Sequence, residues 1–272
     1  MPELPEVETT LRGIQPHVLN KKISGVLVRQ SSLRWPVPEK LIRKKLLSNV
    51  FSNISRRGKY LLLESSNEFL IIHLGMSGSL RIADSGDLKK HDHIDISFED
   101  GTILRYCDPR RFGCFLWTRD IETHFLLKDL GPEPLGNNFN GEHLYHLSRN
   151  RKVSIKNFIM NSKVVVGVGN IYASEALFAS KIRPSSKAGR VPKKKYETLA
   201  MEIIRLLRKS IDQGGTTLRD FVSGDNKPGY FKQSLMVYGR EGESCYNCST
   251  KIKGQRIGQR ASAFCPKCQA TF

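Results

Sequence analysis

The chain has 272 residues and a mass of 30.8 kDa, and 39% of its residues are hydrophobic. That is too long for one small core and suits two or three modules, and the composition excludes collagen, low-complexity disorder and a disulfide-dense miniprotein. Lys and Arg number 44 against 26 Asp and Glu, so the net charge is +18. This surplus favours a polyanionic partner, most often nucleic acid, but it separates neither DNA from RNA nor an enzyme from a packaging protein.

The sequence contains no sign of a membrane span or a secretory leader. No apolar run approaches the roughly 18 residues that a span needs. The first residues, MPELPEVE, include no basic stretch followed by an apolar one. We therefore expect a cytoplasmic protein with no membrane partner.

The N-terminal part of the chain is predicted to be mostly β. Asp100-Gly101 lies between two apolar runs and predicts a hairpin. Several short strands at such spacing are typical of a sandwich or a barrel. Helices are expected at 6–15 and 38–47. The predicted strands, each a short apolar run bounded by turn residues, are 60–63, 69–73, 94–98, 103–106 and 115–117.

The C-terminal part is predicted to be helical. Residues 131–138 read GPEPLGNN, a loop by composition and the expected domain boundary. In 193–213 the apolar residues recur on one face of a 3.6-residue period, and Gly214-Gly215 then ends the predicted helix. A further short helix is expected at 216–222.

Four cysteines form two Cys-x2-Cys pairs near the C-terminus, Cys245 with Cys248 and Cys265 with Cys268. Two such turns can present four thiolates to one tetrahedral ion, which favours zinc. The alternative of two disulfides is disfavoured in an intracellular protein. Because all four ligands come from the protein, the predicted metal is structural and not catalytic.

The first ten residues are acidic although the chain as a whole is basic. Met1 precedes a small residue, and removal of Met1 would expose the secondary amine of Pro2. An α-amino group has a pKa of about 7.7–8.0, so part of it is neutral near pH 7 and can attack a carbon electrophile. Glu3 would lie beside this amine and could transfer a proton.

Nine further segments, taken with the cysteines, resemble one known family, the formamidopyrimidine-DNA glycosylases. Any single segment could arise by chance, but their order along the whole chain could not. The segments are PELPEVET at 2–9, SRRGKYL at 55–61, HLGMSG at 73–78, KHDH at 90–93, DPRRFG at 108–113, GPEPL at 131–135, GVGNIY at 167–172, QGGTT at 213–217 and VYGR at 237–240.

The resemblance implies an α+β fold with an N-terminal β-sandwich and flanking helices. It further implies a C-terminal helix–two-turn–helix domain and a four-cysteine zinc finger. The expected ranges are 1–131 for the catalytic sandwich, 132–225 for the helical DNA-binding domain and 236–272 for the finger. A lesion-recognition loop is expected at about 219–231.

The same resemblance implies a bifunctional DNA glycosylase and AP lyase of base excision repair. Such enzymes remove 8-oxoguanine and formamidopyrimidines from duplex DNA and then cut the strand by β- and δ-elimination. Pro2 matches the nucleophile and Glu3 the acid that protonates the sugar. Lys59 matches the proton donor of β-elimination, and Arg260 the arginine of δ-elimination. No catalytic cofactor is expected.

Other residues match the family's DNA contacts. An extruded base leaves a gap in the duplex, and apolar wedges and arginine suit that gap. Arg110 can also pair with the orphaned cytosine. By itself, Met76 or Phe112 would be read as a core residue, and Lys156 as a surface lysine. The matched positions are Glu6, Met76, His91, Arg110, Phe112, Arg151, Lys156, Asn170 and Tyr172.

Two alternatives remain open at this point. One is an endonuclease VIII-like relative that acts on oxidised pyrimidines; the PELPEVET start and the pair Arg110 and Phe112 favour the formamidopyrimidine branch. The other is a DNA-binding zinc-finger protein without catalysis, against which Pro2, Glu3 and Lys59 argue. The family acts as a monomer in the bacterial cytoplasm, associated with the nucleoid through DNA, and we expect the same here.

Overall fold

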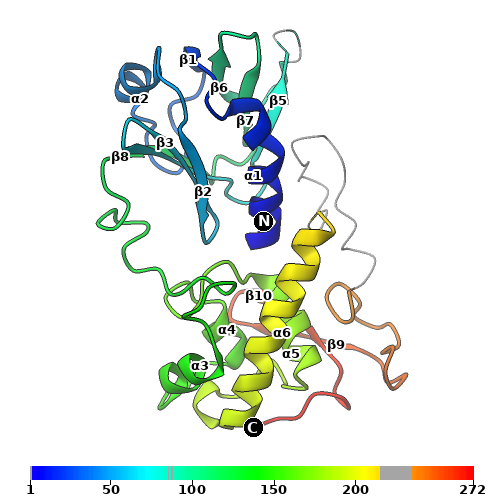
Figure 1. Ribbon diagram of the computed structural model, residues 1–272. Helices are drawn as coiled ribbons and strands as arrows, with labels where there is room; N and C mark the ends of the chain where they lie inside the picture. The colour runs from blue at the N-terminus through cyan, green and yellow to red at the C-terminus, as the bar shows by residue number, and fades with distance from the viewer. Residues whose placement is uncertain (1, 85, 87, 215–234) are drawn as a thin grey trace. The chain divides into compact units, whose positions relative to one another are not determined.

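The computed structural model describes residues 2–84, 86, 88–214 and 235–272 (Figure 1). The chain divides into two units, the first running to Lys128 and the second beginning at Asp129 and including the C-terminal residues to Phe272. The division falls just ahead of 131–138, a stretch with neither helix nor strand. The helix expected at 216–222 and the loop expected at 219–231 lie outside the described residues. Within the described part, no helix is long and apolar enough to cross a membrane.

The first unit is built on two four-stranded antiparallel sheets, ordered β1-β6-β7-β5 and β2-β3-β4-β8 (Figure 1). Apolar side chains of both sheets share one core, so the sheets form a sandwich. The strands are β1 Ile23–Val28, β2 Asn53–Arg57, β3 Tyr60–Ser65, β4 Glu68–His73, β5 Ser79–Ala83, β6 Asp92–Phe98, β7 Ile103–Cys107 and β8 Cys114–Thr118.

The five predicted strands are confirmed as β3, β4, β6, β7 and β8, and the hairpin at Asp100-Gly101 joins β6 to β7. The prediction missed β1, β2 and β5. Polar residues or glycine interrupt the apolar pattern in each, as in Ser24-Gly25 and Arg56-Arg57. These strands are recognisable only from their pairing partners.

Two helices accompany the sandwich, α1 Leu4–Val18 and α2 Glu39–Leu46, in agreement with the prediction. The buried face of α1 includes Val7, Leu11 and Ile14 and packs into the sandwich core. The helix continues beyond the predicted end, through Pro16. That proline is exposed, so its missing N–H removes one hydrogen bond on the solvent side without a clash in the core.

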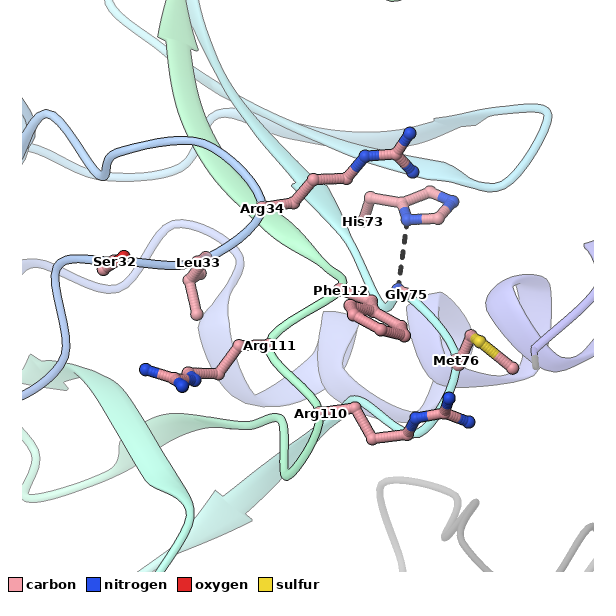
Figure 2. A pocket seen from close by; sticks show the side chains of 9 residues that line it. All are labelled: Ser32, Leu33, Arg34, His73, Gly75, Met76, Arg110, Arg111 and Phe112. Carbon is pink, nitrogen blue, oxygen red and sulfur yellow. Dashed lines mark hydrogen bonds between the residues drawn. The ribbon is translucent and has the colours of Figure 1, made fainter.

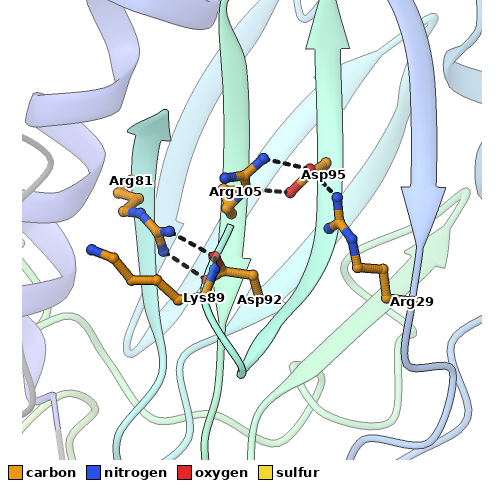
Figure 3. Close-up of polar contacts among 6 residues, drawn as sticks. All are labelled: Arg29, Arg81, Lys89, Asp92, Asp95 and Arg105. Carbon is orange, nitrogen blue, oxygen red and sulfur yellow. Dashed lines mark hydrogen bonds and ion pairs between the residues drawn. The ribbon is translucent and has the colours of Figure 1, made fainter. Parts of the chain in front are cut away.

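The sheet β1-β6-β7-β5 carries ion pairs on the face turned away from the core (Figure 3). Arg81 binds Asp92 with two hydrogen bonds of 2.8 and 2.7 Å, and Arg105 binds Asp95 with two of 2.8 and 2.9 Å. Arg29 adds a bond of 2.7 Å to Asp95. Burial alone would raise the pKa of Asp95, but Arg105 and Arg29 outweigh it and lower that pKa. A slip in strand register would leave these buried charges unpaired, so the pairs help fix the register.

The second unit contains a group of helices and a C-terminal β-hairpin. The predicted helix at 193–213 is confirmed as α6. Gly141 begins α3 against α6, where a Cβ would come within 2.4 Å of the Glu197 Cα, so only glycine permits this approach. The elements are α3 Gly141–Ser148, α4 Ile155–Ile159, α5 Asn170–Ala179, the 3-10 turn η1 Ala188–Arg190, α6 Lys193–Asp212, β9 Lys253–Ile257 and β10 Arg260–Phe264.

Candidate functional site

The N-terminal end of α1 holds the predicted nucleophile and its acid. Pro2 is buried, and Glu3 and Glu6 are only 3% and 2% exposed. Glu3 is the N-cap of α1, and its N–H donates to Glu6 Oε2 at 2.9 Å within a capping box. The local sequence therefore fixes two buried carboxylates in the helix turn that directly follows Pro2.

Lys59 lies in the tight turn between β2 and β3, after Gly58 with φ of +59°. Arg56 supports this turn by donating to the Gly58 carbonyl at 2.8 Å, and it also binds Glu8 of α1 at 3.0 Å. Burial would raise the pKa of Glu8, but Arg56 and Arg12 outweigh it and lower that pKa. The pair of Glu8 and Arg56 thus ties the helix that begins beside Pro2 to the turn that bears Lys59.

His73, at the end of β4, lies close to Lys59 and was not predicted as a site residue. Its ring lies 4.8 Å from the ring of Tyr60, and its Nδ1 accepts the N–H of Gly75 at 3.0 Å. Burial, together with the positive charges of Lys59 and Arg34, lowers the pKa of His73 to about 4. The ring is therefore neutral at pH 7, and its Nε2 carries the proton.

The three predicted insertion residues lie together on two neighbouring loops (Figure 2). Met76 is 39% exposed and Phe112 45% exposed, so neither is the core residue that it could have been by sequence. The Arg110 guanidinium lies 4.9 Å from the centre of the Phe112 ring. All three border a cavity of about 680 Å³ that is also lined by Arg34 and His73. One arginine and two apolar side chains are thus presented to solvent side by side.

His91 is half-buried directly before β6. Its carbonyl accepts the N–H of Asp108 at 3.1 Å, which brings His91 to the base of the loop that carries Arg110. The first unit thus groups its candidates locally, with His91 at the base of the loop that bears Arg110 and Phe112.

The second unit holds the remaining candidates. Arg151 is exposed between α3 and α4. Asn170 begins α5, and its Nδ2 donates to the Ala261 carbonyl at 3.2 Å. Tyr172 is 1% exposed, and its hydroxyl shares a 2.5 Å hydrogen bond with Ser210 of α6. Its side chain is therefore part of the helical core.

Lys156 differs most from the surface lysine that its sequence suggested. It is 0% exposed, and its Nζ donates to the Ala261 carbonyl at 3.1 Å and to Ser262 Oγ at 2.7 Å. Lys156 and Asn170 thus converge on one carbonyl, directly after Arg260. Arg260 itself is exposed at the start of β10, after the hairpin turn.

The four C-terminal cysteines lie close enough to bind one ion. All four Sγ atoms are within 4.8 Å of one another, and three of the separations are 4.0, 3.5 and 3.4 Å. Tetrahedral zinc with Zn–S bonds of about 2.3 Å requires S···S separations of about 3.8 Å. The observed distances fit that requirement.

Glu175 is a further residue that the sequence reasoning missed. It is 3% exposed on α5, and its carboxylate accepts the N–H groups of Met236, Val237 and Tyr238 at 2.8, 3.0 and 2.8 Å. Burial raises the pKa of Glu175, while these bonds oppose the rise. A lone glutamate in the apolar helix IYASEALFA was the available signal. Its role is to join α5 to the segment that leads into the finger.

Two protein-family models match the chain. The formamidopyrimidine-DNA glycosylase N-terminal domain matches residues 1–115, and the formamidopyrimidine-DNA glycosylase H2TH domain matches residues 130–222. Together they cover most of both units.

Individual proteins match over nearly the full length. The formamidopyrimidine-DNA glycosylases of Stutzerimonas stutzeri (strain A1501) and Pseudomonas entomophila (strain L48) are 55% and 54% identical over 270 residues, covering 99% of this chain and 100% of each relative. A complex of Lactococcus lactis Fpg with DNA containing an abasic site has a TM-score of 0.91 at 32% identity. A MutM complex with DNA containing carbocyclic 8-oxo-G has the same values. Both structures cover 99% of this chain and are themselves covered completely.

Proposed function

The chain belongs to the formamidopyrimidine-DNA glycosylase family, and from that premise we propose how its own residues perform the reaction. It is a base excision repair enzyme, a DNA glycosylase that is also an AP lyase. Its substrate is duplex DNA containing 8-oxoguanine, a formamidopyrimidine or an abasic site. The observation that carries this proposal is the buried Pro2 with Glu3 and Glu6 at one helix end.

The nucleophile is the secondary amine of Pro2, after removal of Met1. The amine forms a bond to the sugar C1′, and the damaged base departs with the electron pair of the glycosidic bond. The bound amine gives up its proton to the departing base, Glu3 protonates the ring oxygen O4′, and cleavage of the C1′–O4′ bond leaves an iminium between Pro2 and C1′. Glu6 holds the backbone of Glu3 and lines the pocket for the extruded base.

The strand is then cut in two steps. The iminium makes the C2′ proton acidic, so its removal expels the 3′ phosphate, with Lys59 as proton donor. A second elimination, assisted by Arg260, expels the 5′ phosphate and leaves a one-nucleotide gap. Both side chains are cations under this proposal and also contact phosphates.

DNA is held by phosphate contacts and by insertion into the gap. Met76, Arg110 and Phe112 fill the space of the extruded nucleotide, and their exposure on adjacent loops supports this role. His91, Arg151 and Asn170 contact phosphates, aided by the N-terminus of α5. Lys156 and Tyr172 act indirectly, because their buried side chains shape the surface that others present.

The four cysteines hold one structural Zn²⁺, which the short distances between their sulfur atoms support. The metal would supply folding energy to the finger and no step of the reaction. Residues 1–131 would form the catalytic domain. Residues 132–225 and 236–272 would make most of the phosphate contacts. The enzyme would act as a monomer in the bacterial cytoplasm, bound to the nucleoid through its substrate.

Borohydride trapping tests this proposal directly. The protein is incubated with a duplex containing 8-oxoguanine opposite cytosine, and borohydride then reduces the iminium to a stable protein–DNA adduct. We expect an adduct through Pro2, identified by peptide mass. A Pro2→Gly variant should trap at least about tenfold less, and Glu3→Gln should bind DNA without excising the base.

Three results would contradict the proposal. The absence of any adduct would exclude a reaction through a covalent iminium intermediate. An adduct formed only with oxidised thymine would indicate an endonuclease VIII-like specificity. Full trapping by protein that retains Met1 would assign the nucleophile to another amine.

A further inference from the structure

Two loops carry the insertion residues, and both connect one sheet of the sandwich to the other. Residues 74–78 lead from β4 to β5, and residues 108–113 lead from β7 to β8. The loops are neighbours at both ends, because His73 pairs with Cys114 and Ser79 pairs with Cys107. They therefore run side by side in opposite directions.

The two loops touch through their backbones. A Cβ on Gly75 would lie 2.5 Å from the Gly113 nitrogen and 2.6 Å from the Phe112 carbonyl carbon, and Gly75 has φ of +63°. A Cβ on Gly113 would lie 1.9 Å from the Tyr106 hydroxyl and 2.3 Å from the His73 carbonyl oxygen. Glycine at both positions permits this close approach.

A single hydroxyl group joins the two loops. Tyr106 is 0% exposed on β7, and its hydroxyl lies 3.2 Å from the His73 carbonyl and 3.1 Å from Asp108 Oδ2. The same carboxylate oxygen accepts the N–H of Gly113 at 2.8 Å and so closes the loop of residues 108–113. The hydroxyl thus contacts the start of the first loop and the group that closes the second.

We propose that Tyr106 is a positioning residue whose hydroxyl holds both loops as one body, so that Met76, Arg110 and Phe112 enter the duplex in a fixed relation. The inference rests on the insertion role proposed above for those three residues. Without the hydroxyl, each loop would retain its own hydrogen bonds, but the two could shift against each other. Arg110 would then read the orphaned base less strictly, while the amine at Pro2 would be unaffected.

The test compares Tyr106→Phe with the unaltered protein on three substrates. These are duplexes with 8-oxoguanine opposite cytosine and opposite adenine, and a single-stranded oligonucleotide with an abasic site. We expect kcat for the cytosine duplex to fall about tenfold, the magnitude of one hydrogen bond, and the preference for cytosine over adenine to narrow by a similar factor. Cleavage of the single strand, which has no gap to fill, should stay within about twofold.

Tyr196→Phe is the matched control. Its buried hydroxyl also donates to a carbonyl, that of Ala188 at 2.9 Å, but in the second unit. Tyr196→Phe should lose about as much thermal stability as Tyr106→Phe. It should keep the full preference for 8-oxoguanine opposite cytosine over adenine. The inference would be overturned if Tyr106→Phe excised 8-oxoguanine at the same rate and with the same cytosine preference as the unaltered protein. It would also be overturned if cleavage of the single strand fell as much as excision from the duplex. Failure of the unaltered protein to excise 8-oxoguanine would instead count against the proposed function.

Discussion

A buried ammonium group is costly unless hydrogen bonds compensate for its lost hydration. Lys156 meets this condition through the Ala261 carbonyl and Ser262 Oγ, both on β10. Asn170 donates to the same carbonyl. At the scale of single residues, the second unit thus uses two side chains of its helices to fix the backbone that follows Arg260.

Replacement of Lys156 by Met keeps the aliphatic stem and removes the charge. We expect the free energy of unfolding of the second unit to fall by about 1–3 kcal/mol, because the buried Ser262 hydroxyl loses its donor and the Ala261 carbonyl keeps only Asn170. Denaturant unfolding measures this change. Lys152→Met, at an exposed position four residues earlier in the loop that precedes α4, should change it by less than about 0.5 kcal/mol.

Two outcomes would contradict this view of Lys156. Equal stability of Lys156→Met and Lys152→Met would mean that the buried bonds contribute nothing. Unchanged stability with weakened DNA binding would assign the ammonium to a phosphate and not to β10.

At the scale of elements, the finger depends on its neighbours and on its cysteines. The β9–β10 hairpin has a small apolar cluster that includes Ile252, Ala263 and Phe178 of α5. Glu175 holds the segment that enters the finger through three N–H groups. A core of this size is too small to fold the hairpin alone, which is the usual situation in which a metal supplies the missing free energy.

Metal removal should therefore unfold the finger. We expect one zinc per chain by elemental analysis, and its chelation should expose 236–272 to protease and weaken DNA binding by at least about tenfold. Cys248→Ser should reproduce this effect. Cys107→Ser changes a half-buried cysteine of the first unit and should retain the metal. Unchanged DNA affinity in metal-free protein would show that the finger folds without zinc.

At the scale of the whole molecule, the net charge of +18 has more than one use. Arg81 and Arg105 form buried ion pairs with carboxylates of the first unit. Lys195 donates to the Ser180 carbonyl at the end of α5. Lys193 and Lys194 are exposed at the start of α6, and Lys193 lies 3.4 Å from Glu142. Such exposed cations contribute a general field that attracts any DNA and fades with salt.

Replacing Lys193 and Lys194 together by Gln should weaken the general attraction to DNA without affecting catalysis. Binding to undamaged duplex should weaken about threefold to tenfold at 50 mM salt and less at 200 mM. Excision at saturating enzyme should stay within about twofold. Lys195 is left intact because its loss would also remove the bond to Ser180. A collapse of the excision rate would mean that these lysines contact the lesion site.

Local patterns in the sequence determined most of the secondary structure described above and the metal-binding cysteines. Short apolar runs bounded by turn residues predicted five strands, a 3.6-residue period predicted α6, and cysteine spacing predicted the metal-binding group. These predictions are correct because the periods of strands and helices and the spacing of metal ligands depend on residues that are close together in the sequence. The ordered motifs added the family, since many short matches in sequence carry information that composition lacks.

Only the tertiary structure decided which side chains are buried and which distant residues meet. It placed Lys156 in the interior and Met76 and Phe112 in solvent, the reverse of what each residue type suggests alone. It also brought the Tyr106 hydroxyl between two loops. Burial and contact depend on the pairing of strands far apart in the chain, here β4 with β8 and β5 with β7, and no local pattern contains that pairing.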